Sequence, residues 1–103
     1  MPSKYGTQYR VMYFVYLLLS EKDHGWYIGF TEDIQQRLSY HNLGKNISTS
    51  HRRPWKMIYY EAYLEKLDAL GRERFLKSGA GHRFLRKQLT HYLSNPESIK
   101  LLY

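Results

Sequence analysis

One carboxylate in this chain stands where an apolar side chain would be expected. If residues 66–77 form a helix, Glu73 shares one arc with three apolar residues that should face a sheet: Ala69, Leu70 and Leu76. An unpaired buried carboxylate is costly, so an arginine, a metal ion or several hydrogen-bond donors must lie beside it. A salt bridge at the edge of the sheet is the plainer explanation of Glu73, and both interpretations stay open.

Four more side chains are of types that could act on a charged ligand. Arg37 and His41 are four residues apart, so a helix would place them on one face. Tyr16 and Tyr27 fall on two segments that have the pattern of a hairpin. A shared surface face would explain the first pair, and cross-strand packing would explain the second. These residues therefore carry chemistry only if the fold brings them together.

The first part of the chain predicts a hairpin followed by a helix. Residues 11–19 are nearly continuously apolar, as in a central strand buried on both faces. Residues 21–25 have turn chemistry, and residues 26–30 follow as a second strand. A helix is expected from an N-cap at Thr31 to about Asn42.

Details at the two ends of that helix also follow from residue type. Glu32 and Asp33 are expected in its first turn, where carboxylates favour the helix dipole, and Gly44 is expected as its C-terminal cap glycine. Residues 44–54 lack periodicity, are polar and basic, and end in a proline. They are predicted to form a mobile basic loop.

The second part predicts one strand and two helices. A third strand is expected over residues 55–63 and a helix over 66–77, followed by a break at 78–81. A last helix is expected over 83–93, stopped by Asn95-Pro96.

The order strand, strand, helix, strand, helix, helix predicts an α/β fold of the α+β type, with a small three-stranded antiparallel sheet flanked by helices. No repeat or linker divides the chain, so a single domain over residues 1–103 is expected, with its core at about 12–93.

Composition narrows the possible functions. The 103 residues contain 16 Lys and Arg against 9 Asp and Glu, a net charge of +7, which favours a polyanionic partner. The absence of cysteine excludes disulfides, thiolate nucleophiles and zinc-thiolate sites. The sequence has no apolar run of the roughly twenty residues needed to span a bilayer, and residues 1–6 lack an apolar signal region. A cytoplasmic location and no membrane partner are therefore expected.

The order and spacing of these residues resemble the GIY-YIG nuclease superfamily. Two short triplets lie in the hairpin, Phe14-Val15-Tyr16 and Tyr27-Ile28-Gly29, with Phe14 in place of the usual glycine. A helix arginine and a later helix glutamate follow, Arg37 and Glu73. The resemblance covers residues 12–90. Within the superfamily, the chain is similar to small single-domain bacterial members and to the nuclease domain of the nucleotide-excision-repair endonuclease. Their further motif pieces are matched by Thr31, Asp33, His41, Asn42, Gly44, Arg52 to Trp55, and Lys77.

The resemblance implies a divalent-metal-dependent DNA endonuclease. Glu73 would hold one Mg²⁺ or Mn²⁺ ion, a hard cation that accepts one carboxylate while water and phosphate oxygens fill its other positions. Arg37 would contact the scissile phosphate. Tyr27 is favoured as the base that takes a proton from the attacking water, and Tyr16 as a residue that positions phosphate or water. His41 would orient a tyrosine or assist proton transfer.

Two points of physical chemistry bear on these implied roles. A free phenol has a pKa of about 10 and is a poor base at neutral pH, so the charges of Arg37 and of the metal would have to favour the phenolate. Gly29 is expected to be structural, since a glycine lets the backbone approach a site closely.

Nucleic-acid contacts are expected from basic residues in and after the loop: Lys45, His51, Arg52, Arg53, Lys56 and Lys77. Basic residues on the later helices should add to them: Arg72, Arg74, Arg83, Arg86 and Lys87. Family enzymes usually gain specificity from an added domain, which these 103 residues do not contain. Structure-directed or weakly sequence-specific cleavage, in DNA repair or recombination, is therefore expected, or else a targeting protein partner.

Several alternatives stay open. RNA could replace DNA as the substrate, and the chain could be a monomer or a homodimer. A nucleic-acid-binding module that keeps the fold without turnover is the main alternative function, and a protein-interaction domain whose charge serves only solubility is another. A binding module has no need for Glu73, which would repel phosphate in the absence of a metal.

Overall fold

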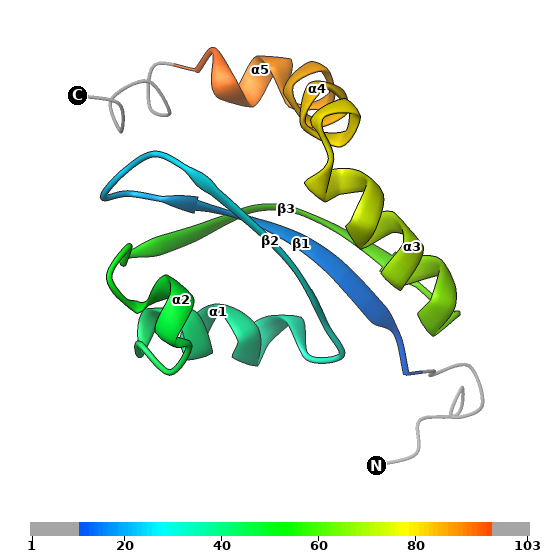
Figure 1. Ribbon diagram of the computed structural model, residues 1–103, viewed down its shortest axis with the longest axis horizontal. Coiled ribbons are helices and arrows are strands. Elements are labelled where there is room, and N and C mark those ends of the chain that lie inside the picture. Colours follow the sequence, from blue (N-terminus) through cyan, green and yellow to red (C-terminus); the bar gives the residue numbers. More distant parts are fainter. Residues whose placement is uncertain (1–10, 96–103) are drawn as a thin grey trace, which may run out of the picture.

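The centre of the molecule is a three-stranded antiparallel sheet (Figure 1), and the computed structural model describes residues 11–95. The strands are β1 (Tyr13–Ser20), β2 (Trp26–Thr31) and β3 (Trp55–Tyr63), in the spatial order β2-β1-β3. The predicted central position of the first strand and the predicted fold class are both confirmed.

Helices cover both faces of this sheet (Figure 1). On one face lie α1 (Ile34–Asn42) and α2 (Ile47–Ser50); on the other lie α3 (Lys66–Lys77), α4 (Gly79–Gln88) and α5 (Thr90–Leu93). Side chains along β1 alternate between the two cores: Val15 and Leu17 pack toward α3, and Tyr16 and Leu18 pack toward α1. Because both faces are covered, β1 is apolar almost without interruption.

The turn from β2 into α1 differs from the predicted one. Thr31 is the last residue of β2, and the N-cap is Asp33, whose side chain accepts a hydrogen bond from the backbone N–H of Gln36 at 3.0 Å. The Thr31 hydroxyl instead accepts from the backbone N–H of Asp33 at 3.0 Å. The predicted Thr31 cap is therefore wrong, as is the placing of Glu32 and Asp33 in the first turn, because the aspartate takes the capping position itself.

Contrary to the prediction from sequence, residues 44–54 are not irregular throughout, because residues 47–50 form the short helix α2. Gly44 has a φ of +76° just after α1, the backbone of a cap glycine, as predicted. Asn46 then caps α2 by accepting from the backbone N–H of Ser48 at 2.9 Å. The Asn42 side chain fixes the far end, since it accepts from the backbone N–H of Trp55 at 2.6 Å and donates to its carbonyl at 3.0 Å. The conformation of residues 44–54 is set by polar side chains that cap the backbone, so a search for apolar periodicity does not detect α2.

The break between α3 and α4 is a single residue, Ser78, and is shorter than predicted. Ser78 caps α4 by accepting from the backbone N–H of Gly81 at 3.1 Å, so residues 79–81 are helical and the predicted break over 78–81 is too long. A Cβ on Gly81 would lie 2.5 Å from Leu76 Cα, and glycine therefore lets the two helices meet closely. A further interruption at Leu89 divides the predicted helix 83–93 into α4 and α5.

Two expectations concern residues that the structure does not describe. The predicted stop involves Pro96, and the expected lack of a signal region concerns residues 1–6; both lie outside residues 11–95. Over the described part of the chain, no helix has the length and apolar character needed to cross a membrane.

Candidate active site

Three buried side chains form a line from β1 to α1 and α2. The Tyr16 hydroxyl and His41 Nε2 are 3.0 Å apart, and His41 Nδ1 lies 2.8 Å from the Thr49 hydroxyl oxygen. The Thr49 hydroxyl donates to the Asn46 carbonyl at 3.4 Å, so its oxygen is left to accept the proton of His41 Nδ1. This tautomer makes Nε2 the acceptor, and Tyr16 therefore donates its proton to a neutral His41.

Tyr27 stands beside this line on β2, which is an edge strand. Its ring centre is 5.0 Å from that of His41 and 6.4 Å from that of Tyr16. Space for the Tyr16 ring comes from its cross-strand partner Gly29, since a Cβ there would lie 2.5 Å from Tyr16 Cζ. The close approach at Gly29 that the sequence suggested is thus made by the Tyr16 ring.

Two neighbours hold Arg37 next to these rings. Its Nε lies 3.4 Å from the Thr31 hydroxyl oxygen, and its guanidinium carbon lies 4.9 Å from the centre of the Tyr40 ring. Stacking on an aromatic face fixes the plane of a guanidinium, and its edge can then donate to two oxygens of an anion. Arg37 is thereby oriented as a site for a phosphate or carboxylate group.

Glu73 approaches from the other face of the sheet. Its helix, α3, packs against Val15 and Ile28 through Ala69 and Leu76, the α3 side of the strands. The charge of Glu73 nevertheless acts on the Tyr16 hydroxyl, whose side chain lies on the α1 side. Glu73 lies on α3, as predicted, but its side chain is 18% exposed, so it lies at the margin of the buried stripe of Ala69 and Leu76 and not within it.

A partly buried ion pair fixes α3 in this position. Glu61 on β3 accepts from Arg72 Nε at 2.8 Å and from Arg72 Nη2 at 3.0 Å. The hydroxyls of Tyr59 and Tyr63 donate to the same carboxylate, each at 2.5 Å. Since Arg72 precedes Glu73, this pairing sets the rotation of α3 that directs Glu73.

Burial and charge shift the pKa values of this cluster. Burial raises the pKa of the Tyr16 hydroxyl well above its usual value, with Tyr27 and Glu73 acting in the same direction and Arg37 in the opposite one. Burial also lowers the pKa of His41, and the positive charge of Arg37 lowers it further. Neutral His41 and protonated Tyr16 are therefore the stable forms in the folded protein.

The Glu61 network has its own shifts. Burial acts to raise the pKa of Glu61, but hydrogen bonds from Arg72 and the two tyrosines outweigh it and hold that pKa below its ordinary value. Burial and the adjacent carboxylate raise the pKa values of Tyr59 and Tyr63 to about 12. All three groups thus keep one protonation state across the neutral range.

Glu73 is the carboxylate through which a metal ion could be held. Within residues 11–95, no group of three or more His, Cys, Asp or Glu side chains could enclose one. Glu73 Oε2 lies 3.1 Å from Lys77 Nζ, and 18% of the Glu73 side chain is exposed. A hard cation accepts a single carboxylate together with water and phosphate oxygens, so this donor set fits an ion shared between Glu73 and a phosphate ligand.

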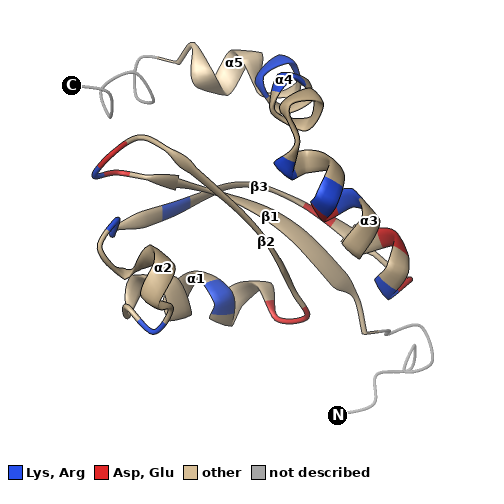
Figure 2. Ribbon diagram, in the orientation of Figure 1, with Lys and Arg blue, Asp and Glu red and all other residues tan. Residues whose placement is uncertain are grey.

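The predicted nucleic-acid contacts are distributed on both sides of the sheet (Figure 2). Most of them are exposed: Lys45, His51, Arg53, Lys56, Arg74, Lys77, Arg83, Arg86 and Lys87. Arg52 is instead half-buried and paired within the protein: its Nε donates to the exposed Asp23 at 2.6 Å, and its guanidinium carbon lies 4.7 Å from the centre of the Trp55 ring. Arg72 is half-buried and bound to Glu61, so most of its hydrogen-bond donors face inward.

The sequence reasoning missed two residues that support the cluster and gave a third, Thr31, a different role. Tyr40 is three residues after Arg37, and this helical spacing could have indicated their contact. Thr31 was assigned to a cap, although its hydroxyl also approaches Arg37. No pattern pointed to Thr49, because α2 is a short helix specified by its cap.

Comparison with known proteins gives a consistent result. The family model described as GIY-YIG catalytic domain matches residues 12–84. A UPF0213 protein of Lacticaseibacillus paracasei is 39% identical over 72 residues, which cover 69% of this chain and 80% of the relative. A UPF0213 protein of Streptococcus pneumoniae is 36% identical over 86 residues, 82% of each chain.

One solved structure is also similar. The solution NMR structure of a UPF0213 protein from Bacillus halodurans is 30% identical and covers 84% of this chain and 90% of its own, with a TM-score of 0.45.

Proposed function

This chain belongs to the GIY-YIG catalytic domain family, a nuclease superfamily, and on that premise we propose that it is a divalent-metal-dependent endonuclease that hydrolyses DNA phosphodiester bonds. The observation that supports this proposal is the contact of Tyr16, Tyr27 and His41, together with the charges of Arg37 and Glu73, which act on the pKa of the Tyr16 hydroxyl. Phosphodiester hydrolysis needs a proton acceptor for water and positive charge on the phosphoryl oxygens. Tyrosine, arginine and a metal-binding carboxylate supply those needs.

Tyr27 is the favoured proton acceptor because the Tyr16 hydroxyl already donates its proton to His41. The Tyr16 hydroxyl is buried, donates to His41 Nε2 and has a raised pKa, so it holds its proton firmly. Tyr27 is only half-buried, and its ring lies against His41. Tyr16 then serves to fix the imidazole and, through it, the ring of Tyr27.

Arg37 would bind the scissile phosphate. Stacking on Tyr40 and the contact with Thr31 hold its guanidinium plane, and a fork of N–H donors matches two phosphate oxygens. Its charge would also stabilise the additional negative charge of the transition state.

Glu73 would hold one Mg²⁺ or Mn²⁺ ion together with the substrate. When bound, such an ion polarises phosphoryl oxygens and lowers the pKa of water. Lys77, whose side chain is 55% exposed, contacts the carboxylate in the absence of an ion and can move away from it at little cost.

We also propose that cleavage is structure-directed or weakly sequence-specific, in a role such as DNA repair or recombination. The exposed basic residues on both sides of the sheet support phosphate contacts, and such contacts carry no direct sequence information. A targeting protein partner would supply further selectivity.

A nicking assay on plasmid and branched DNA with Mg²⁺ or Mn²⁺ tests the proposal. Glu73→Gln and Tyr27→Phe should each lose at least about a hundredfold of the nicking rate. Matched controls are Glu65→Gln, an exposed carboxylate at the start of the same helix, and Tyr60→Phe, a tyrosine on β3 that is 54% exposed. Both controls should cut like the wild type.

Equal cutting by wild type, Glu73→Gln and Tyr27→Phe would refute the assigned site. If no variant cuts, the nuclease proposal fails and a non-catalytic nucleic-acid-binding module takes its place; the ion pair of Glu73 with Lys77 favours this alternative, since it neutralises Glu73 without a metal. A binding titration then identifies that module, because phosphate contacts make affinity fall steeply with salt.

A further inference from the structure

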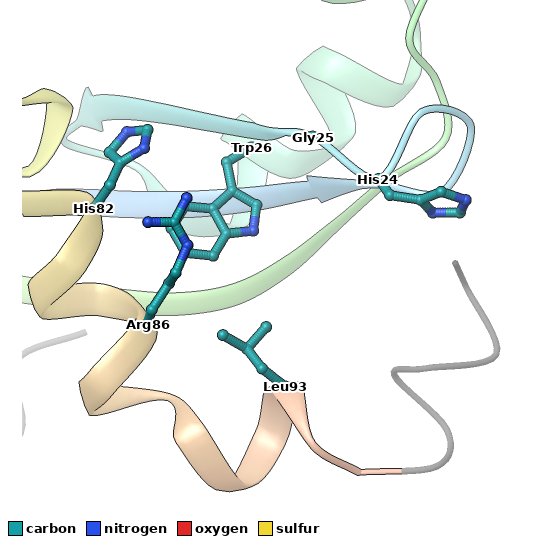
Figure 3. A pocket seen from close by; sticks show the side chains of 6 residues that line it. All are labelled: His24, Gly25, Trp26, His82, Arg86 and Leu93. Atoms are coloured by element: carbon teal, nitrogen blue, oxygen red, sulfur yellow. The ribbon is translucent and has the colours of Figure 1, made fainter. Parts of the chain in front are cut away.

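A groove lies between the β1–β2 hairpin and the two last helices (Figure 3). Its volume is about 390 Å³, and its lining residues are His24, Gly25, Trp26, His82, Arg86 and Leu93. The indole of Trp26 extends from β2 between Arg86 of α4 and Leu93 of α5 (Figure 3). The volume lies within the range of roughly 300–1,000 Å³ that is usual for small-ligand sites.

The groove combines an aromatic surface with positive charge. The Arg86 guanidinium carbon lies 5.6 Å from the centre of the Trp26 ring, and the His82 ring lies 5.5 Å from it. An indole and a guanidinium both stack on flat aromatic ligands. A ligand that is planar and attached to negative charge therefore fits this lining better than an apolar one.

The surrounding helices strengthen the preference for an anionic ligand. Residues 79–93, which contain α4 and α5, include Arg83, Arg86 and Lys87 and no aspartate or glutamate (Figure 2). The acidic residue nearest in sequence to Trp26 on the hairpin is Asp23, whose carboxylate is bound to Arg52. The groove thus faces a positively charged part of the surface.

The groove and the candidate active site share one strand. Trp26 begins β2 and Gly29 lies three residues further along, a separation of about 10 Å in an extended strand. Trp26 faces the α3 side and Tyr27 the α1 side, but β2 is an edge strand, so a ligand can pass around it.

We propose that this groove binds an unpaired base of a DNA strand a few nucleotides from the bond that is cleaved. The base stacks on Trp26 and Arg86, and its phosphates meet the basic face of α4. The choice of DNA as the ligand rests on the function proposed above. The groove would favour substrates with a single-stranded segment beside the cleavage point, such as branched or flapped DNA.

Stacking can be separated from simple phosphate attraction by comparing two oligonucleotides. One is an unmodified strand of about eight nucleotides, and the other has the same phosphates but abasic sugars. Binding is followed by tryptophan fluorescence in EDTA, where no cleavage occurs. The chain has two tryptophans, and Trp55 is only 3% exposed, so quenching by bases reports on Trp26.

The wild type should bind the unmodified strand at least about fivefold more tightly than the abasic one, with quenching of its fluorescence. Trp26→Leu and the surface variant Arg86→Ala should each reduce this preference. The charge-matched control Arg83→Ala lies on the same helix outside the groove; it should weaken binding of both strands alike and keep the preference.

Equal affinity for the two strands, or a preference that Trp26→Leu and Arg86→Ala leave intact, overturns the inference. Failure to bind either strand overturns it as well. The nicking assay decides the proposed function independently, because a protein that cuts but shows no preference for bases would keep the nuclease proposal and lose this groove.

Discussion

Gly29→Ala should disrupt the candidate active site without touching any of its polar groups. The new Cβ would lie 2.5 Å from Tyr16 Cζ and still nearer to the hydroxyl oxygen, so the ring must move by at least about 0.9 Å to reach an ordinary contact of 3.4 Å. Such a shift breaks the 3.0 Å contact of Tyr16 with His41. Overpacking costs about 1–3 kcal/mol and a lost buried hydrogen bond about 0.5–1.5 kcal/mol, so the free energy of unfolding should fall by about 2–4 kcal/mol.

Urea and thermal unfolding measure this loss. The melting temperature should fall by at least about 8 °C. The control is Gly71→Ala in the interior of α3, where the nearest atom to a new Cβ is Arg74 Nη2 at 4.0 Å; it should leave stability unchanged or raise it by up to about 1 kcal/mol.

A double-mutant cycle tests the cause. In a Tyr16→Ala background the ring is absent, so Gly29→Ala should cost less than about 0.5 kcal/mol. If Gly29→Ala is as stable as the wild type, or costs as much without the Tyr16 ring as with it, the close packing of Tyr16 on Gly29 is not what requires glycine there.

Two further predictions concern the groups that support the cluster. Glu61→Gln should weaken the pairing with Arg72 and lower the free energy of unfolding by about 1–3 kcal/mol. Because Glu73 then loses its position, the nicking rate should fall more than the affinity for DNA. An unchanged nicking rate in a destabilised variant would contradict this role of Glu61. The pKa of His41 is lowered in the folded state, so below about pH 6.5 His41 is protonated in the unfolded chain and stays neutral in the folded one. The free energy of unfolding should therefore fall as the pH decreases from there. Urea midpoints from pH 7.5 to 5 should show a shallower decrease for His41→Gln than for the wild type, and parallel curves would count against a buried neutral His41.

The sequence predicted the strands and the long helices well because their buried faces require apolar residues at regular spacing. The central strand, the third strand and α3 all lie close to their predicted positions. It failed where hydrogen bonds of polar side chains decide the backbone. The Asp33 cap, the short helix after Asn46 and the single-residue break at Ser78 are of this kind.

The sequence by itself determined which chemical groups are present, their order and, through the spacing of the two tyrosines, Arg37 and Glu73, the family. Only the tertiary structure decided how those groups are used. The tautomer of His41 depends on Thr49, and the position of Glu73 depends on α3 being held against β3 by Arg72 and Glu61. Both are contacts between segments far apart in the chain, and the geometry of such contacts is set by packing, which local residue patterns do not record.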